Sequence, residues 1–76
     1  QFTPATEEIG DQYYDGVYKS LEEAYVWYRV AQCAGNVKVD SLVDYLNTKL
    51  IRTKCFKLSL RAKHIYASAL QYKDKA

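Results

Sequence analysis

The sequence predicts an all-α protein of four helices, arranged as two antiparallel helical hairpins of the kind found in α/α repeat proteins. Apolar residues recur every three or four positions in four successive segments, which is the period of an amphipathic helix. Turn and capping residues separate these segments, and no segment shows the alternation typical of a strand. The 76 residues allow one domain. We expect residues 5–36 to form the first hairpin, residues 37–72 the second, and residues 73–76 a frayed tail.

The first helix is predicted to begin at Thr3, whose hydroxyl can cap free backbone N–H groups, and to continue to about Tyr14. A proline follows the cap, where its missing N–H costs nothing. Gly10 lies within this helix at a cost of about 1 kcal/mol relative to alanine, so we expect a neighbouring helix to approach closely there. An Asp-Gly turn at residues 15–16 ends the helix. The apolar face consists of Ala5, Ile9 and Tyr13.

Ser20 and Glu23 have the spacing of a capping box, in which a hydroxyl and a carboxylate each accept a hydrogen bond from the other residue's backbone N–H. The second helix should run from Leu21 to Cys33 and stop at Gly35, which can adopt a left-handed backbone conformation. Apolar residues cover nearly all of its sides, so we expect burial on several faces by neighbouring helices or by a partner. Its inner stripe consists of Leu21, Ala24, Tyr28 and Ala31.

Asn36 is expected to cap a third helix over about residues 37–50, and Thr53 to cap a fourth helix over about residues 54–72. Both helices carry an apolar stripe with helical spacing, and the short connectors indicate that consecutive helices are antiparallel. The stripes are Val39, Leu42, Val43, Leu46 and Leu50 in the third helix, and Leu58, Ala62, Ile65 and Ala69 in the fourth.

The first hairpin also carries a specific set of small, aromatic and turn residues. These are Ala5, Ile9-Gly10, Tyr13-Tyr14, Gly16-Val17, Ser20, Ala24, Trp27-Tyr28, Ala31 and Gly35-Asn36. As a set they resemble the Sel-one-like repeat, an α/α unit related to the tetratricopeptide repeat. The turn is two residues shorter than the usual form in that family, and the cap is serine rather than aspartate. Residues 37–72 resemble this family much less. They are similar to the divergent pair of helices that often closes an array of Sel-one-like repeats.

The resemblance implies a scaffold that binds other proteins and is rarely catalytic, used as an adaptor, an inhibitor or an assembly factor, often in bacterial envelopes. Repeats bury their apolar faces on their neighbours, so a single repeat is expected to need a partner or a second copy of itself. We therefore predict a small module that binds another protein stoichiometrically, such as a secreted effector or an envelope enzyme. A toxin-immunity protein is the most concrete form of this prediction.

The formal net charge of +2 conceals two halves of opposite sign. Residues 1–44 hold eight acidic and three basic residues, a charge of −5, whereas residues 45–76 hold eight basic residues and one acidic residue, a charge of +7. This segregation indicates a polar partner or self-association, for example as a homodimer. The fourth helix has a basic face, which is either a solvated surface, a docking surface for an acidic protein or, as the alternative function, a nucleic-acid contact. Its basic members are Lys54, Lys57, Arg61 and His64, Gln71 continues the face, and Arg52 and Lys63 flank it.

Tyrosine is unusually frequent, with eight in 76 residues. Tyr13, Trp27 and Tyr28 are expected in the core, but so small a domain cannot bury every aromatic residue. Exposed tyrosines are among the residue types that contribute most to protein interfaces. We therefore predict a second partner-binding surface beside the acidic residues of the first half, formed by Tyr14, Tyr18 and Tyr25.

No constellation of residues suited to catalysis is recognisable, so neither enzymatic activity nor a cofactor is predicted. His64 is the only histidine, and the nearest carboxylate in sequence, Asp74, follows ten residues later. Cys33, Cys55 and His64 lack the number and spacing of zinc ligands. An up-down bundle would place the two cysteines near opposite ends, too far apart for a disulfide. We expect two unpaired, partly buried thiols.

The chain begins at Gln1 and contains no methionine. This favours removal of a signal peptide and a periplasmic or secreted location, with trimming of a cytoplasmic protein as the alternative. No stretch approaches the roughly 18 apolar residues of a membrane-spanning helix, so we expect no membrane span.

Overall fold

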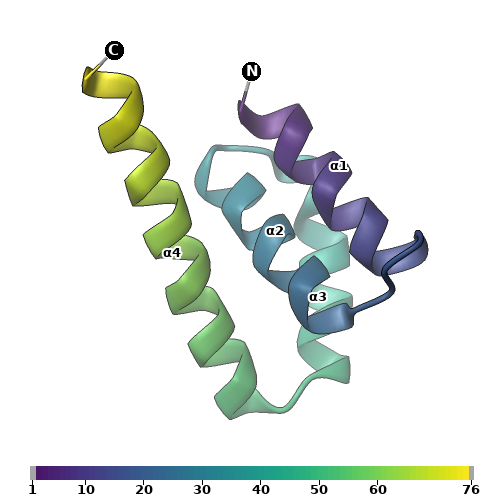
Figure 1. Ribbon diagram of the computed structural model, residues 1–76. Coiled ribbons are helices and arrows are strands. Elements are labelled where there is room, and N and C mark those ends of the chain that lie inside the picture. Colours follow the sequence, from purple (N-terminus) through teal and green to yellow (C-terminus); the bar gives the residue numbers. More distant parts are fainter. Residues whose placement is uncertain (1, 76) are drawn as a thin grey trace.

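The structure is a computed structural model that describes residues 2–75, and it describes side chains for residues 5–71. It confirms the all-α class with four helices, and the described part of the chain contains no strand. The elements are α1 (Phe2–Asp15), α2 (Leu21–Cys33), the 3₁₀ turn η1 (Val37–Val39), α3 (Asp40–Lys49) and α4 (Arg52–Lys75) (Figure 1).

Helix α2 is the centre of the fold, and the other helices pack around it (Figure 1). Helices α1 and α3 run antiparallel to α2, whereas α4 runs parallel to it. The pairing of Glu22 with Lys54 and of Tyr25 with Ser59 shows this parallel register. Although α4 follows α3 in the chain, its main packing partner among the helices is α2.

Two apolar clusters form on different sides of α2, because that helix is apolar nearly all round, as predicted. One cluster joins α2 to η1 and α3 and consists of the buried residues Ala24, Tyr25, Tyr28, Ala31, Val39, Val43 and Leu46. The other joins α2 to α4 and consists of Val26, Val30 and Ala62, with Leu58 and Ile65 packed against them. The prediction was wrong for Ile9 and Leu21, which are 37% and 39% exposed.

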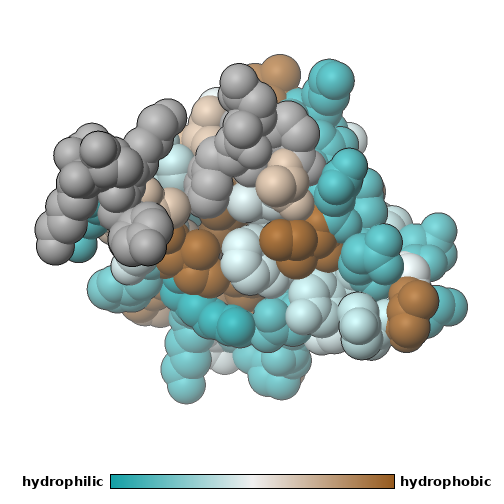
Figure 2. Space-filling view, turned by 45° about the horizontal axis from the view of Figure 1, so that its top comes forward, coloured by the Kyte–Doolittle hydropathy of each residue, from teal (hydrophilic) through white to brown (hydrophobic). Residues whose placement is uncertain are grey.

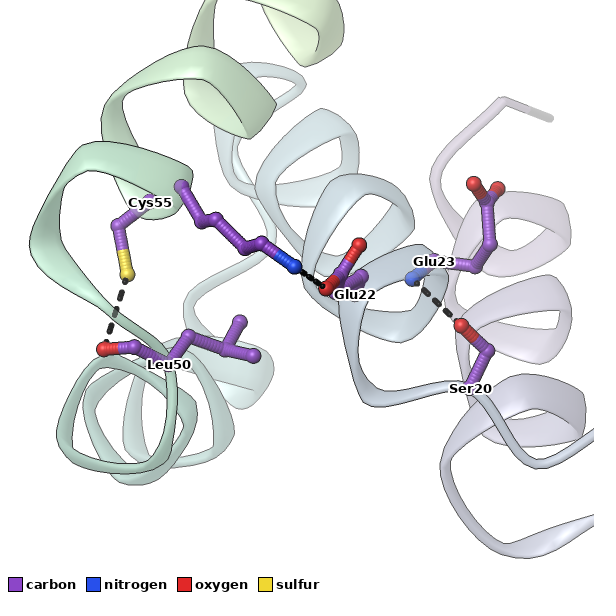
Figure 3. Close-up of polar contacts among 6 residues, drawn as sticks. Ser20, Glu22, Glu23, Leu50 and Cys55 are labelled. Carbon is purple, nitrogen blue, oxygen red and sulfur yellow. Dashed lines mark hydrogen bonds and ion pairs between the residues drawn. The ribbon is translucent and has the colours of Figure 1, made fainter.

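The N-terminus of α2 confirms one half of the predicted capping box. Ser20 Oγ accepts a hydrogen bond from the Glu23 backbone N–H at 3.3 Å (Figure 3). The Ser20 backbone N–H, however, donates to the carbonyl of Tyr13 at 2.7 Å. This bond ties the end of α1 to the start of α2, and it leaves the Glu23 carboxylate available for a different partner.

Helix α2 ends at Cys33, and Gly35 terminates it as predicted, in a Schellman motif. Gly35 has φ +96°, its N–H donates to Gln32 at 2.9 Å, and the N–H of Asn36 donates to Ala31 at 3.0 Å. The predicted cap at Asn36 is also confirmed, because its Oδ1 accepts a hydrogen bond from the Lys38 backbone N–H at 2.8 Å. The chain then enters η1 before α3 begins at Asp40.

The remaining helix ends differ from the predictions. Helix α4 begins at Arg52, so Thr53 lies inside it and does not act as the N-cap. The same helix continues to Lys75, so residues 73–75 are helical rather than a frayed tail. Helix α1 begins at Phe2, ahead of Thr3, whose side chain lies outside the described residues.

Candidate interaction surface

The predicted tyrosine surface is not assembled, because Tyr25 is buried. Its side chain is only 2% exposed. The hydroxyl donates to Asn47 Oδ1 at 2.8 Å and lies 3.3 Å from Ser59 Oγ, so it links α2 to both α3 and α4. The prediction that Tyr25 faces a partner is therefore wrong, and its role is to hold three helices together.

The other two tyrosines of that surface lie in different environments. Tyr14 is half-buried, and its ring packs edge-on against Tyr28 and Tyr45 with centroid distances of 6.2 and 6.5 Å. Tyr18 lies in the connection between α1 and α2 and is 69% exposed, with its ring 5.8 Å from that of Tyr13. Of the three residues, only Tyr18 is largely exposed to solvent.

The structure places the predicted basic residues along one flank of α4, and all four are exposed. Two of them form ion pairs with the N-terminus of α2. Lys54 Nζ lies 2.6 Å from Glu22 Oε2 (Figure 3), and Arg61 Nη1 lies 2.6 Å from Glu23 Oε2. The hydrogen bond to Glu23 raises the pKa of Arg61. Two of the three lysine and arginine charges on this flank, those of Lys54 and Arg61, are therefore paired within the chain.

A groove that the sequence did not reveal lies between α2 and α4, on the opposite flank of α4. It encloses about 330 Å³. Its lining combines the cations Arg29, Arg52 and Lys63 with the exposed apolar side chains Phe56 and Leu60, and none of the described lining residues is acidic. In the sequence, this groove could have been predicted from the spacing of Phe56 and Leu60, which are four residues apart and therefore lie on the same side of a helix.

A second cavity, of about 430 Å³, has the opposite charge. It lies where α1 meets α2 and α3, and Asp11, Asp15, Tyr14 and Tyr28 line it. Asp11 accepts a hydrogen bond from the Tyr28 hydroxyl at 2.5 Å. The segregation of charge along the sequence thus reappears in space as one acidic and one basic cavity.

Figure 2 shows one face of the molecule. Among the described residues visible on it, apolar side chains come to the surface at separate places, with hydrophilic side chains between them. Single exposed apolar residues of this kind are normal on a protein surface. The groove beside α4 is different because its apolar and cationic side chains lie together.

The two cysteines are free, as predicted. Cys55 is half-buried, and its Sγ donates a weak hydrogen bond to the carbonyl of Leu50 at 3.9 Å (Figure 3). Cys33 is exposed, so the prediction of partial burial was wrong for this residue. Within the described residues, histidine, cysteine and acidic side chains form no group of three or more that could hold a metal ion.

Comparisons with protein-family models, with curated proteins and with solved structures give no match for this chain. None of the helices in the described part of the chain has both the length and the apolar character needed to cross a membrane. Function therefore has to be inferred from the surface itself.

Proposed function

We propose that the chain is a small, non-enzymatic module that binds another protein stoichiometrically, and that α4 provides its main contact surface. The observation that carries this proposal is the exposure of Phe56 beside the cations of the groove. Its side chain is 67% exposed on a helix whose other side is already packed on α2. Burying a side chain of this size contributes about 1.5–3 kcal/mol, which a partner could gain.

The composition of the groove supports a protein partner. Aromatic residues and arginine are enriched where proteins meet, and they contribute most of the binding energy when they are fully desolvated. Phe56, Arg29 and Arg52 supply both types within one cavity. A small cluster of this kind can serve as the anchor of an interface.

The groove is also held in place before any partner arrives. The apolar cluster of Val26, Val30 and Ala62 packs α4 on α2. The ion pairs of Lys54 and Arg61 and the contact between Tyr25 and Ser59 add polar links between the same two helices. A surface that is already ordered loses less conformational entropy on binding. This favours a stoichiometric binder such as an adaptor, an inhibitor or a toxin-immunity protein.

The same ion pairs weigh against nucleic acid, the alternative predicted for α4. Lysine and arginine side chains bind a phosphate backbone by displacing the counterions condensed on the nucleic acid. Lys54 and Arg61, however, already face Glu22 and Glu23. A duplex on this flank would meet those carboxylates. The resemblance to Sel-one-like repeats further supports a protein partner, and it supports action in a bacterial envelope, in the periplasm or outside the cell.

Capture from a native cell envelope tests this proposal. Tagged wild-type chain, Phe56→Ser and Lys57→Gln would be used as baits under identical conditions. Lys57 is an exposed cation on the opposite flank of α4, so its variant is the matched control. We expect one stoichiometric protein to be retained by the wild type and Lys57→Gln and to be lost with Phe56→Ser. Nucleic acid in the eluate, or the same proteins with all three baits, would contradict the proposal.

A further inference from the structure

We propose that the groove beside α4 receives an acidic amphipathic α-helix of a partner protein. This inference rests on the proposed function and names the chemistry of its partner. Four observations carry it: the spacing of the exposed apolar residues on α4, their position relative to α2, the charge of the groove, and the buried tyrosine at its base.

The exposed apolar residues of α4 have the spacing of a helix-packing seam. Phe56, Leu60, Ala67 and Leu70 are exposed, and Lys63 fills the position between the second and third of them. The intervals are therefore four, three, four and three, which is the pattern by which one helix packs along another in a coiled coil. At a rise of 1.5 Å per residue, the stripe is about 21 Å long.

This seam lies on a different side of α4 from the stripe that packs on α2, and its N-terminal part, Phe56 to Lys63, borders the groove. The stripe that packs toward α2 contains Leu58, Ala62 and Ile65, and Ala62 is fully buried. With 3.6 residues per turn, the two stripes are separated by well over a quarter of a turn. Leu60 and Leu70 remain 41% and 43% exposed. Helix α4 therefore has one occupied and one unoccupied packing side.

The positive charge of the groove favours an occupant with negatively charged side chains. Arg29, Arg52 and Lys63 border it, and among the described residues none of the three takes part in an ion pair. Arg29 donates to the neutral side chain of Gln32 at 2.7 Å. Glutamate or aspartate side chains flanking an apolar stripe would complement these cations, as flanking charges do in paired helices.

The base of the groove is polar at one point, where a buried side chain has its hydrogen-bond partners within the chain. The buried Tyr25 reaches it from α2, and its hydroxyl lies 3.3 Å from Ser59 Oγ in α4. An incoming helix would therefore meet a preformed surface along α4.

A second copy of the chain is a poorer occupant. Its acidic helix α1 exposes Glu8, Asp11 and Asp15, which could face the cations. Within residues 5–15 of α1, Ile9 is the only large apolar side chain that is exposed, at 37%. A helix with one such residue cannot cover a seam of Phe56, Leu60 and Leu70, so we assign the groove to a different protein.

Two designed peptides test the proposal directly. Each is a 16-residue, lactam-stapled helix with leucine at the seam positions, and the flanking positions are glutamate in one peptide and lysine in the other. Binding to the chain would be measured by fluorescence anisotropy at low and high salt. We expect the glutamate peptide to bind at least about tenfold more tightly than the lysine peptide, and this preference to shrink at high salt because exposed charges are screened.

Variants of the chain locate the site. Phe56→Ser and the double variant Arg52→Gln/Lys63→Gln should each lower the affinity for the glutamate peptide about tenfold. Lys57→Gln should leave this affinity unchanged. Circular dichroism would confirm that each variant is folded. Equal affinity for both peptides, or no loss in the double variant, would overturn the proposal. Self-association of the free chain that blocks the peptide would overturn it in favour of a second copy.

The envelope capture separates this inference from the proposed function. If a captured protein depends on Phe56 but is retained by Arg52→Gln/Lys63→Gln, the partner is not an acidic helix, while the module still binds protein through α4. If capture is independent of Phe56, both proposals fail.

Discussion

The backbone of Gly10 in α1 lies against the ring of Tyr28 in α2. A Cβ atom added to Gly10 would lie 2.7 Å from Tyr28 Cε1, which is closer than carbon atoms can pack. The Tyr28 hydroxyl passes this contact and donates to Asp11, one residue further along α1. The close approach predicted for Gly10 is therefore confirmed, and it determines how tightly the first hairpin packs.

Gly10→Ala should destabilise the protein despite the better helix propensity of alanine. The propensity gain is about 1 kcal/mol, but forcing a methyl group into a packed contact costs about 1–3 kcal/mol or more. We expect a net loss in the free energy of unfolding, measured by urea denaturation. Glu8→Ala, at an exposed position of the same helix, is the control and should change stability by less than about 0.5 kcal/mol. An increase in stability for Gly10→Ala would show that α1 can move away from α2.

The burial of Tyr28 and its hydrogen bond to Asp11 also predict that the stability of the protein depends on pH. Burial, and then the hydrogen bond to Asp11, raise the pKa of Tyr28 above its ordinary value of about 10. Above pH 10 the unfolded chain releases this proton while the folded chain retains it, so stability falls as pH rises, by up to about 1.4 kcal/mol per pH unit from this group. Below pH 10 the group has no such effect.

Tyr28→Phe should remove this alkaline loss of stability. At neutral pH the variant lacks the hydrogen bond to Asp11, which contributes about 0.5–1.5 kcal/mol. Unfolding would be measured by denaturant titration from pH 7 to pH 11. The difference between wild type and variant isolates Tyr28 from the other tyrosines. Parallel curves for the two proteins over this range would contradict the prediction.

The ends of α2 could be predicted because their determinants are local. Ser20 accepts from a residue three positions away, and Gly35 closes bonds to the last turn of the same helix. Such contacts depend on sequence spacing alone. The prediction failed for Glu23, whose carboxylate pairs with Arg61, 38 residues later, because no local pattern shows which distant cation will lie nearby.

The candidate site was harder to predict than the fold. Tyr25 is buried because η1 and α3 pack against it on one side and α4 on another. This arrangement is set by tertiary packing. Both apolar stripes of α4 have helical spacing, so periodicity alone does not tell which one faces α2. The stripe with Leu58 and Ala62 was recognised, while the one with Phe56 and Leu60 was missed.

The two thiols should differ in their accessibility to reagents. Cys33 is exposed at the end of α2, whereas Cys55 is half-buried and directed toward the carbonyl of Leu50. We expect an aromatic disulfide reagent to modify Cys33 in a fast phase and Cys55 in a slow phase, and Cys33→Ser to remove the fast phase alone. Mass spectrometry after mild oxidation should show no intramolecular disulfide. A single phase for both thiols would contradict the structure.

Tyr25 and Tyr18 should respond to substitution in opposite ways. Tyr25→Phe removes the hydroxyl that bonds to Asn47 and lies beside Ser59, which should cost about 0.5–1.5 kcal/mol of stability. Tyr25→Ala also leaves a cavity, which raises the cost to about 3–5 kcal/mol and threatens folding of so small a domain.

Tyr18→Ala is the matched control, because Tyr18 is 69% exposed and its loss should change stability by less than about 0.5 kcal/mol. Thermal unfolding of the three variants measures the difference. If Tyr25→Ala and Tyr18→Ala had equal midpoints, Tyr25 could not hold α2 to α3 and α4. In that case, a loss of partner binding in Tyr25→Ala would indicate a direct contact between Tyr25 and the partner. If Tyr25→Ala is instead much less stable than Tyr18→Ala, as we expect, its loss of binding reflects only the loss of the fold that supports the groove.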